Sequence, residues 1–417
     1  MVKGRDMLYQ QVFYGHTCSR VHGEMMCISA QYFNLNRILL LTIGLWPYQQ
    51  SKLDRLRFIF LVGILTTAIL FQFTTFLTSK CIADFIVKIL SNVLIFIIFV
   101  IHYIFFAINI KTVKDLLTQL QYVYDQIKDE CENAIVEKYN SNAKRYTKAL
   151  TTVSICAIFT IIIAQLWSNI IDVILTKNIS QSYSLPIMTE YFVDQKKYYF
   201  LIFLHINAAI CIGVAGILSI GTLFISYLEH ICGLFKISSH RIKRAMRINV
   251  LQNINPKNNI LVLEEIRCAV VIHRQAMKLS KALASKFQAM LFLLIAIGVI
   301  VLSLNLFQIV QIALNGDNVD EILIPFVLVL ISILYMFCAN YLGQNLTDHN
   351  NYVFISVYDV QWYLAPLCVQ KVILFLLQKN SQEFTISVGG LFIASLEGFA
   401  TLVKASVSYF TVIYSTQ

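Results

Sequence analysis

The chain has 417 residues, of which 58% are hydrophobic and only 13% are Asp, Glu, Lys or Arg. A soluble domain is about 45–50% apolar and about 25% charged, so this composition excludes an ordinary soluble protein and indicates a membrane protein with several spans. The formal net charge of +10 does not imply a nucleic-acid partner, because the basic residues stand between apolar runs, where they orient spans in a membrane. We therefore expect contact with membrane lipid and no nucleic acid.

The sequence carries no motif typical of an enzyme. The ten Cys are scattered, mostly within apolar runs, and no CxxC or Cys/His spacing indicates a metal site or a disulfide framework. There is no GxSxG, HExxH, Walker A or GxGxxG motif, and the eight His stand apart from one another. We predict that the protein is not an enzyme and that it binds no metal or cofactor.

The N-terminal part of the chain precedes the spans. Residues 1–31 are polar and lack the apolar core of a signal peptide, so we expect a cytosolic segment there. Residues 32–46 are apolar but too few for a span, which needs about 20, and Pro47 ends the run. We interpret this run as an interfacial or re-entrant helix. Residues 32–417 are expected to form one membrane domain.

Seven longer apolar runs follow, and each is long enough to cross a hydrocarbon core of about 30 Å. Backbone amides and carbonyls in lipid must be satisfied within the segment itself, so these runs are expected to be helices. The predicted fold class is therefore an all-α membrane protein with seven transmembrane helices. The spans are residues 58–77, 89–110, 149–175, 198–228, 287–314, 322–343 and 386–415.

The basic residues are distributed asymmetrically between these spans. The N-terminus and the second, fourth and sixth loops carry 27 Lys and Arg, whereas the other three loops carry 5. The positive-inside rule then places the N-terminus in the cytosol and the C-terminus outside the cell. Asn178 begins a glycosylation sequon in the third loop, on the predicted outer face, which makes it the candidate for glycosylation.

Two segments on the predicted cytosolic side are helical without spanning the membrane. Residues 229–286 contain two amphipathic stretches, in which apolar residues recur every three to four positions, separated near Pro256. Residues 344–383 contain an apolar run that is too short to span. We expect the fourth and fifth spans to continue into the cytosol as long helices. The segments 229–286 and 344–383 are together called the anchor region below.

The last span combines apolar length with charge. Glu397 and Lys404 stand seven residues apart and therefore share one helical face. Charge inside a membrane is expensive and usually faces a bundle interior or a water-filled cavity. We interpret both as helix-packing charges that meet partners on neighbouring spans, with a pore role as the alternative. The tail that follows has polar groups every two to three residues and is expected to line a pore: Ser406, Ser408, Tyr409, Thr411, Tyr414 and Ser415.

A small apolar ligand would need a pocket that is mostly apolar with a few polar groups to fix its orientation. The sequence has 29 Phe, 21 Tyr and 3 Trp, and several lie in the outer halves of predicted spans. The alternative for each of these side chains is ordinary packing or contact with lipid. The candidates for such a pocket are Trp167, Ser168, Tyr199, His205, Tyr335 and Phe96.

From about residue 32 onward, five segments in order resemble the insect odorant receptors. Taken together, they resemble the odour-tuned subunits of the family, such as those of ants, bees and wasps. They do not resemble the shared co-receptor, which has a longer fourth loop. The segments are GLWP at 44–47, EHICG at 229–233, NYLGQ at 340–344, Tyr358 with Trp362, Tyr363 and Pro366, and SLEGF at 395–399 followed by KASVSYFTV at 404–412.

This resemblance implies a ligand-gated, non-selective cation channel in the plasma membrane of sensory-neuron dendrites. Tuned subunits of the family form heterotetramers with the odorant co-receptor, around one pore that is lined by the seventh span. A small volatile odorant binds in the outer half of the helix bundle, and cations permeate. The resemblance puts Val412 on the hydrophobic gate, and it puts Ser415 and Thr416 where the co-receptor carries Gln and Leu.

Two other receptor classes are alternatives. A gustatory-type channel has the same architecture, but its usual seventh span ends in Gln-Phe, which is absent here. A G-protein-coupled receptor also has seven spans, but its N-terminus lies outside the cell, which the distribution of basic residues opposes. A transporter would require a pair of broken-helix repeats, and the sequence has none.

Overall fold

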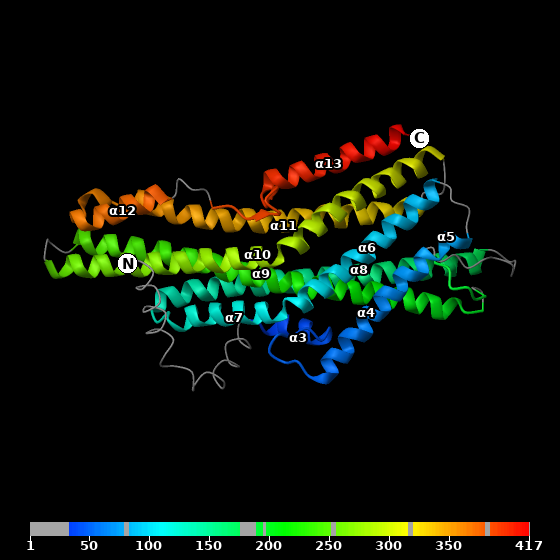
Figure 1. The fold of residues 1–417 in the computed structure, drawn as a ribbon, viewed down its shortest axis with the longest axis horizontal. Coiled ribbons are helices and arrows are strands. Elements are labelled where there is room, and N and C mark those ends of the chain that lie inside the picture. Colours follow the sequence, from blue (N-terminus) through cyan, green and yellow to red (C-terminus); the bar gives the residue numbers. More distant parts are fainter. Residues whose placement is uncertain are drawn as a thin grey trace, which may run out of the picture.

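The computed structural model describes residues 33–78, 83–175, 189–194, 197–251, 256–315, 320–379 and 384–416. These residues form an elongated bundle whose longest helices run along its length (Figure 1). The elements are α3 (Asn34–Thr42), α4 (Lys52–Phe73), α5 (Thr75–Thr78), α6 (Ala83–Ile108), α7 (Ile110–Asp125), α8 (Glu130–Leu175), α9 (Tyr199–Leu251), α10 (Pro256–Asn315), α11 (Asp320–Asp359), η1 (Trp362–Leu364), α12 (Leu367–Lys379), β1 (Ser387–Val388), β2 (Phe392–Ile393) and α13 (Leu396–Ser415).

Seven of the described helices are long and apolar enough to cross a membrane: α4, α6, α8, α9, α10, α11 and α13. The predicted seven-helix, all-α fold is thus confirmed. Four of these helices are much longer than a bilayer requires, and the two longest are α9 with 53 residues and α10 with 60. At 1.5 Å per residue they measure about 80 and 90 Å, against a hydrocarbon core of about 30 Å. The long extensions expected for the fourth and fifth spans are therefore present.

The start of the last span differs from the prediction. The run 386–415 is not one helix, because β1 and β2 form an antiparallel hairpin that pairs Ser387 with Ile393 and Val388 with Phe392. Gly389 and Gly390 turn the hairpin with φ of 67° and 69°, which glycine adopts without steric cost. The helix begins only after Ser395, whose hydroxyl accepts a hydrogen bond from the Gly398 amide at 3.0 Å. Hydropathy cannot separate two short apolar strands from a helix, which is why the prediction began ten residues too early.

The short N-terminal helix packs into the bundle. Its Leu40 is fully buried, and its Leu39 carbonyl accepts a hydrogen bond of 3.1 Å from the Ser219 hydroxyl on α9. Asn36 accepts a second bond, of 3.2 Å, from Ser226 on the same helix. The predicted run at 32–46 thus contains a short helix, α3, and α9 holds this helix in place.

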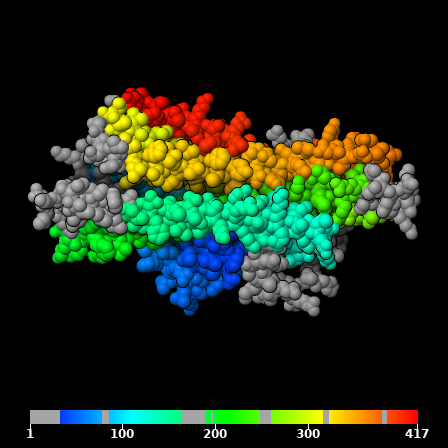
Figure 2. Space-filling model, turned by 180° about the vertical axis from the view of Figure 1, so that it is seen from behind, coloured from blue at the N-terminus to red at the C-terminus, as the bar shows by residue number. Residues whose placement is uncertain are grey.

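The apolar core falls into two clusters. The larger one joins residues from α3 through α12 and continues to Phe384. The smaller one contains Val299 and Leu302 of α10, Val329 and Met336 of α11, and Leu402 of α13. The last helix thus has a small core of its own. Figures 1 and 2 both show α13 on the outer flank of the bundle, beside α10 and α11.

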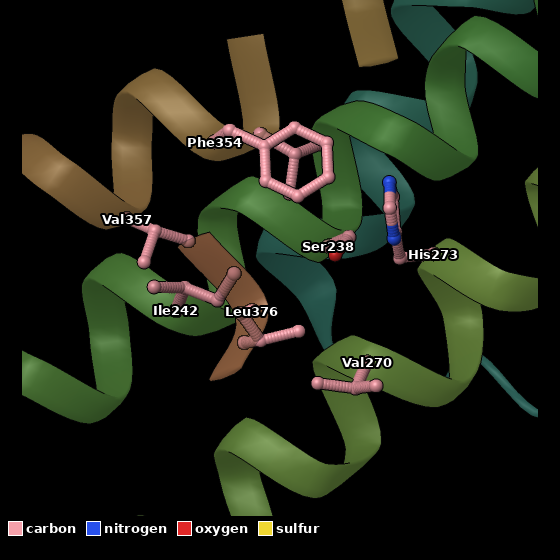
Figure 3. A pocket seen from close by; sticks show the side chains of 8 residues that line it. Ser238, Ile242, Val270, His273, Phe354, Val357 and Leu376 are labelled. Carbon is pink, nitrogen blue, oxygen red and sulfur yellow. The ribbon is translucent and has the colours of Figure 1, made fainter. Parts of the chain in front are cut away.

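The anchor region packs the ends of α9, α10 and α11 against α12, at the end of the bundle opposite to the C-terminus (Figure 1). Side chains from all four helices line a small cavity there, including Ser238, His273, Phe354 and Leu376 (Figure 3). The cavity measures about 10 Å³, which accommodates about one water molecule. It is far too small for an organic ligand.

Candidate functional site

The six predicted pocket residues fall on four helices. Trp167 and Ser168 belong to α8, but their side chains lie outside the described residues, as does Asn178 with its sequon. Tyr199 and His205 lie at the start of α9, and Tyr199 faces Phe203 with ring centroids 6.1 Å apart. Tyr335 lies on α11 and Phe96 on α6. The structure therefore describes the side chains of four of the six.

His205 is held on both sides of its ring. Its Nε2 lies 3.0 Å from the Thr67 hydroxyl on α4, and its Nδ1 lies 2.7 Å from the phenol of Tyr191. The single hydroxyl proton of Thr67 points to backbone carbonyls of its own helix, at 3.0 Å, so this oxygen accepts from Nε2–H. With the ring proton on Nε2, Nδ1 is an acceptor, so the phenol of Tyr191, whose pKa burial raises to about 12, donates to Nδ1. Both ring nitrogens of His205 are thus occupied by the protein.

Further contacts attach the segment before α9, which contains Glu190 and Tyr191, to α4. The ring of Tyr191 stacks on Phe71 with centroids 4.0 Å apart. The amide of Glu190 donates to the Phe71 carbonyl at 2.9 Å, and the Thr74 hydroxyl donates to the Glu190 carbonyl at 2.6 Å. His205 therefore belongs to a structural joint between α4, α9 and the segment before α9.

A second polar pair joins α6 to α11. His102 Nδ1 lies 2.8 Å from the Ile98 carbonyl, which can only accept, so Nδ1 carries the proton. Nε2 then accepts from the Tyr335 hydroxyl, 3.0 Å away. This bond uses the only proton of Tyr335 and leaves its oxygen able to accept another hydrogen bond. Phe96 is buried one and a half turns earlier on α6, edge-to-face with Phe99 at 5.6 Å. Of the expected pocket residues, His205 and Tyr335 thus belong to two separate polar contacts, one between α4 and α9 and one between α6 and α11.

The predicted pore residues are all exposed near the C-terminal end of α13, but they do not lie on one helical face. Tyr409 and Val412 are 59% and 57% exposed, and Ser415 and Thr416 are exposed as well. Leu402 and Ser406, by contrast, are buried against α10 and α11. Tyr409 follows Leu402 by seven residues and lies on that side of the helix, beyond the buried positions. The Ser406 carbonyl also accepts a hydrogen bond of 2.9 Å from the Ser303 hydroxyl on α10.

An exposed polar stripe runs along the whole of α13. Its members recur every three or four residues, so they lie on one helical face. Counted at about 100° per residue, this face is opposite to Leu402 and Ser406. We call it the polar stripe; it consists of Glu397, Thr401, Lys404, Ser408, Thr411 and Ser415.

Glu397 and Lys404 therefore do not have the packing role within one chain that we predicted. Both side chains are exposed, and neither forms an ion pair within the part of the chain that the structure describes. The physical reason is their phase on the helix, because the seven-residue spacing puts both in the polar stripe rather than on the face that packs. They share a helical face with Ser408 and Ser415 and do not anchor α13 to α10 or α11.

Comparison with known proteins identifies the family. A family model described as 7tm odorant receptor matches residues 82–407, which is most of the chain. The chain belongs to the insect odorant receptor family. This odorant receptor is therefore a multi-pass membrane protein, and the resemblance seen in its C-terminal motifs is confirmed.

Two relatives match part of this odorant receptor. The odorant receptor coreceptors of Aedes aegypti and Aedes albopictus are each 26% identical to it over 158 residues. The matched segment covers 38% of this chain and 32% of the coreceptors, so the similarity spans about a third of their length.

Two solved structures share the fold of this odorant receptor. The insect olfactory receptor OR5 from Machilis hrabei has a TM-score of 0.71 in complex with eugenol and 0.70 without it, at 14% identity. The match covers 93% and 94% of this chain, and 98% and 100% of the two OR5 chains. At this identity the likeness concerns the fold alone.

Nothing in the sequence singled out Thr67, Tyr191 or Ser303, or indicated a partner for His102. Their partners are far away in the chain: His102 and Tyr335, for example, are 233 positions apart. A lone His or Ser in an apolar helix carries no local sign of which helix it faces. The polar stripe, by contrast, could have been found from the sequence by extending the Glu397–Lys404 spacing in both directions.

Proposed function

We propose that this odorant receptor is an odour-tuned subunit of a ligand-gated, non-selective cation channel, and that α13 forms one wall of its pore. The observation that carries this proposal is the polar stripe. Six polar side chains, one acidic and one basic, face outward along a helix of membrane-spanning length. Contact with lipid would be strongly unfavourable for them, whereas a water-filled pore shared between subunits would hydrate them.

The proposed assembly is a heterotetramer with the odorant co-receptor, in the dendritic plasma membrane of a sensory neuron. Sequence similarity to two coreceptors supports a common architecture for such subunits. The anchor region supplies a contact surface, because η1 and α12 expose large apolar side chains in a part that we place outside the bilayer. Patches of this kind mark protein contacts. These residues are Tyr363, Leu364, Leu367, Leu374 and Phe375.

The proposed odorant site includes Tyr335 and Phe96, with Tyr199, Trp167 and Ser168 as further candidates from α9 and α8. Tyr335 is partly accessible, and its oxygen can still accept a hydrogen bond after donating to His102. This gives a small volatile ligand one polar contact in apolar surroundings, which is the usual design of such a site. His205 acts as a structural support, because both of its ring nitrogens are occupied.

In the proposed mechanism the odorant binds the open state more tightly than the closed state, and only that difference shifts the equilibrium. Val412 flanks the polar stripe near the outer end of α13 and supplies a hydrophobic constriction. Opening moves the Val412 side chains of neighbouring subunits apart, so that hydrated cations pass. Membership in a receptor family agrees with a role that does not involve catalysis.

Electrical recording tests the proposal. Cells that express this chain together with an odorant co-receptor are expected to show inward cation current during an odorant panel. Cells that express only this chain, or only the co-receptor, serve as controls. They identify any current that forms without the other subunit. A full-size response from this chain without a co-receptor would contradict the heteromer. A response that requires a G protein and disappears in excised patches would contradict the channel.

A further inference from the structure

We propose that Lys236, Lys243 and Tyr352 form a binding site for a polyphosphorylated anion of the cytosol, on the outside of the anchor region. The two lysines lie on α9 and the tyrosine lies on α11, so a bound anion would tie these two helices together. The site goes beyond the proposed function, because it involves neither the pore helix nor the residues that we propose for the odorant.

Two ammonium groups gather on one aromatic ring. Lys236 Nζ lies 4.0 Å from the centroid of the Tyr352 ring, and Lys243 Nζ lies 5.0 Å from the same centroid. Lys243 also donates a hydrogen bond of 3.1 Å to the Tyr352 hydroxyl. The ring attracts each cation through its quadrupole, but it has no net charge and cannot neutralise them. Two like charges are therefore held close together.

No carboxylate neutralises these two lysines within the part of the chain that the structure describes. Neither ammonium group forms an ion pair there. The acidic residue one turn before Tyr352 is Asp348, and it accepts a hydrogen bond of 2.8 Å from Gln344 instead. The positive charge at this place is thus left for a partner from outside the chain.

Two arginines on another side of α9 are arranged differently. Arg241 binds Glu132, and Arg244 binds Glu265 and also Asp129. Each of these guanidinium groups therefore has a carboxylate from α8 or α10. The missing counter-charge is a particular feature of the two lysines and not a general property of the helix.

The phenol of Tyr352 adds a third donor. A lysine ammonium group can only donate, so the phenol oxygen accepts from Lys243 and keeps its own proton. The hydrogen bonds and charges of Lys243 and Lys236 lower the pKa of this phenol to about 8. At neutral pH the phenol is still mostly protonated, and it is a stronger donor than an ordinary tyrosine. The site thus offers two positive charges and one hydroxyl proton.

Packing between α9 and α11 holds these donors in place. Ser239 lies on the turn of α9 between the two lysines, and its hydroxyl donates to the hydroxyl of Ser356 at 2.6 Å. Both serines are buried, and Ser356 follows Tyr352 by one helical turn. The backbone positions of the three donors are therefore fixed before a ligand arrives, which reduces the entropy lost on binding.

The donors match a phosphate group. A phosphate monoester carries about two negative charges at neutral pH and three strong acceptor oxygens, and lysine binds phosphate as a point charge. A carboxylate carries one charge and is suited to the planar fork of arginine. His240 and Arg247 each follow one of the lysines by four residues, so they continue the same face of α9 and extend the site toward further phosphates.

The position of the site favours a soluble anion over a membrane lipid. The fourth span is predicted to end at residue 228, so Lys236 and Lys243 lie about 12 and 22 Å beyond it along the helix. The headgroup layer on each side of the hydrocarbon core is only about 5–8 Å thick. The phosphate of an ordinary phospholipid does not reach this depth, whereas an inositol polyphosphate in the cytosol does.

Calorimetric titration with inositol hexakisphosphate tests the site on the complex with the co-receptor, purified into phosphatidylcholine nanodiscs. The double variant Lys236→Gln/Lys243→Gln is expected to weaken binding to this chain by about tenfold or more, because charge-assisted hydrogen bonds are lost. The co-receptor is the same in every sample, so a difference between variants reports this chain. An unchanged Kd and an unchanged number of binding sites would overturn the proposal.

The matched control is Arg267→Gln/Arg274→Gln, which removes the same charge from exposed positions of α10 in the anchor region. The control should bind the probe like the wild type. An equal loss of affinity in both double variants would show unspecific attraction to a basic surface and would also overturn the site.

Tyr352→Phe keeps the ring under both ammonium groups and removes only the hydroxyl. We expect its Kd to rise by about three- to tenfold, as for one hydrogen bond to a charged group. The melting temperature without the probe checks that each variant is folded. If the lysine variant does not yield a folded complex, an unchanged Kd in Tyr352→Phe overturns the site.

The membrane composition separates the two sources of phosphate. The titration is repeated in nanodiscs that also contain phosphatidylinositol 4,5-bisphosphate. An equal Kd in both kinds of nanodisc is expected for a soluble anion. A Kd that this lipid raises for the wild type, but not for Lys236→Gln/Lys243→Gln, would assign the site to a lipid headgroup and overturn the soluble anion. None of these measurements needs a current, so they stand apart from the proposed pore.

Discussion

Arg241 and Glu132 form a two-pronged ion pair between α9 and α8. The Nε and Nη2 atoms of Arg241 each donate to one carboxylate oxygen of Glu132, both at 2.7 Å. The Glu132 side chain is only 1% exposed, so water contributes little to its solvation. Arg244 stands beside this pair and binds Glu265 at 2.7 Å and also Asp129. The cluster joins the start of α8 to both long helices of the anchor region.

Removing the carboxylate charge should destabilise the anchor region. Glu132→Gln leaves the largely buried Arg241 without its counter-charge, which we expect to cost about 3 kcal/mol. The exposed pair of Arg267 and Glu264 provides the control, because Glu264→Gln should cost less than about 1 kcal/mol. Thermal unfolding of the purified complex in detergent measures both. Equal melting temperatures for the two variants would show that the pair does not support the fold.

The phenol of Tyr335 should matter most for odorants that can donate a hydrogen bond. Tyr335→Phe removes the donor to His102 and the free acceptor, so the EC50 of hydroxyl-bearing odorants should rise by about tenfold. Odorants without a donor should shift less. Tyr341→Phe on the same helix is the control, because the Tyr341 ring stacks on Phe337 instead. The same shift for every odorant would argue against direct contact at Tyr335.

Tyr191 should affect all odorants alike. Tyr191→Phe takes the donor away from His205 and loosens the joint to α4, without removing a group that faces a ligand. We expect the EC50 of each active odorant to change by one common factor, about two- to tenfold. Tyr198→Phe, a few residues along the same segment, is the control. Loss of the response to some odorants and not to others would indicate that Tyr191 or His205 touches the ligand.

The orientation of the chain can be tested with epitope tags. We expect an N-terminal tag to be labelled only after cells are permeabilised, and a C-terminal tag to be labelled on intact cells. The reason is the excess of Lys and Arg in the N-terminus and in the second, fourth and sixth loops. Labelling of the N-terminal tag on intact cells would show the opposite topology, in which the C-terminal end of α13 lies on the cytosolic side.

The sequence predicts the number of spans and the long helical extensions because both depend on local properties. A run of apolar residues identifies a span wherever it packs, and amphipathic periodicity shows that α9 and α10 continue beyond the membrane. The exception is the hairpin before α13. Its apolar strands and the helix have similar hydropathy, and the local signs that the run is broken are the Gly389–Gly390 turn and Ser395, which caps the helix.

The candidate site depends on contacts between distant segments, and these cannot be read from a single sequence. Tyr335 was predicted without its partner, since nothing near it indicates that His102 lies opposite. Glu397 and Lys404 show a different limit. Their common face follows from the spacing, but whether that face points inward or outward depends on how α13 sits on α10. In the structure this face, with Glu397 and Lys404, is exposed and points away from α10 and α11.

The central claim is that the polar stripe of α13 faces the ions. The most direct measurement is the single-channel conductance of Lys404→Glu in the complex with the co-receptor, with Lys278→Glu in the anchor region as the matched control. A negative charge on the pore wall attracts cations, so Lys404→Glu should increase the conductance, and more strongly at low ionic strength. A conductance equal to that of the wild type and of Lys278→Glu at every salt concentration would contradict the account.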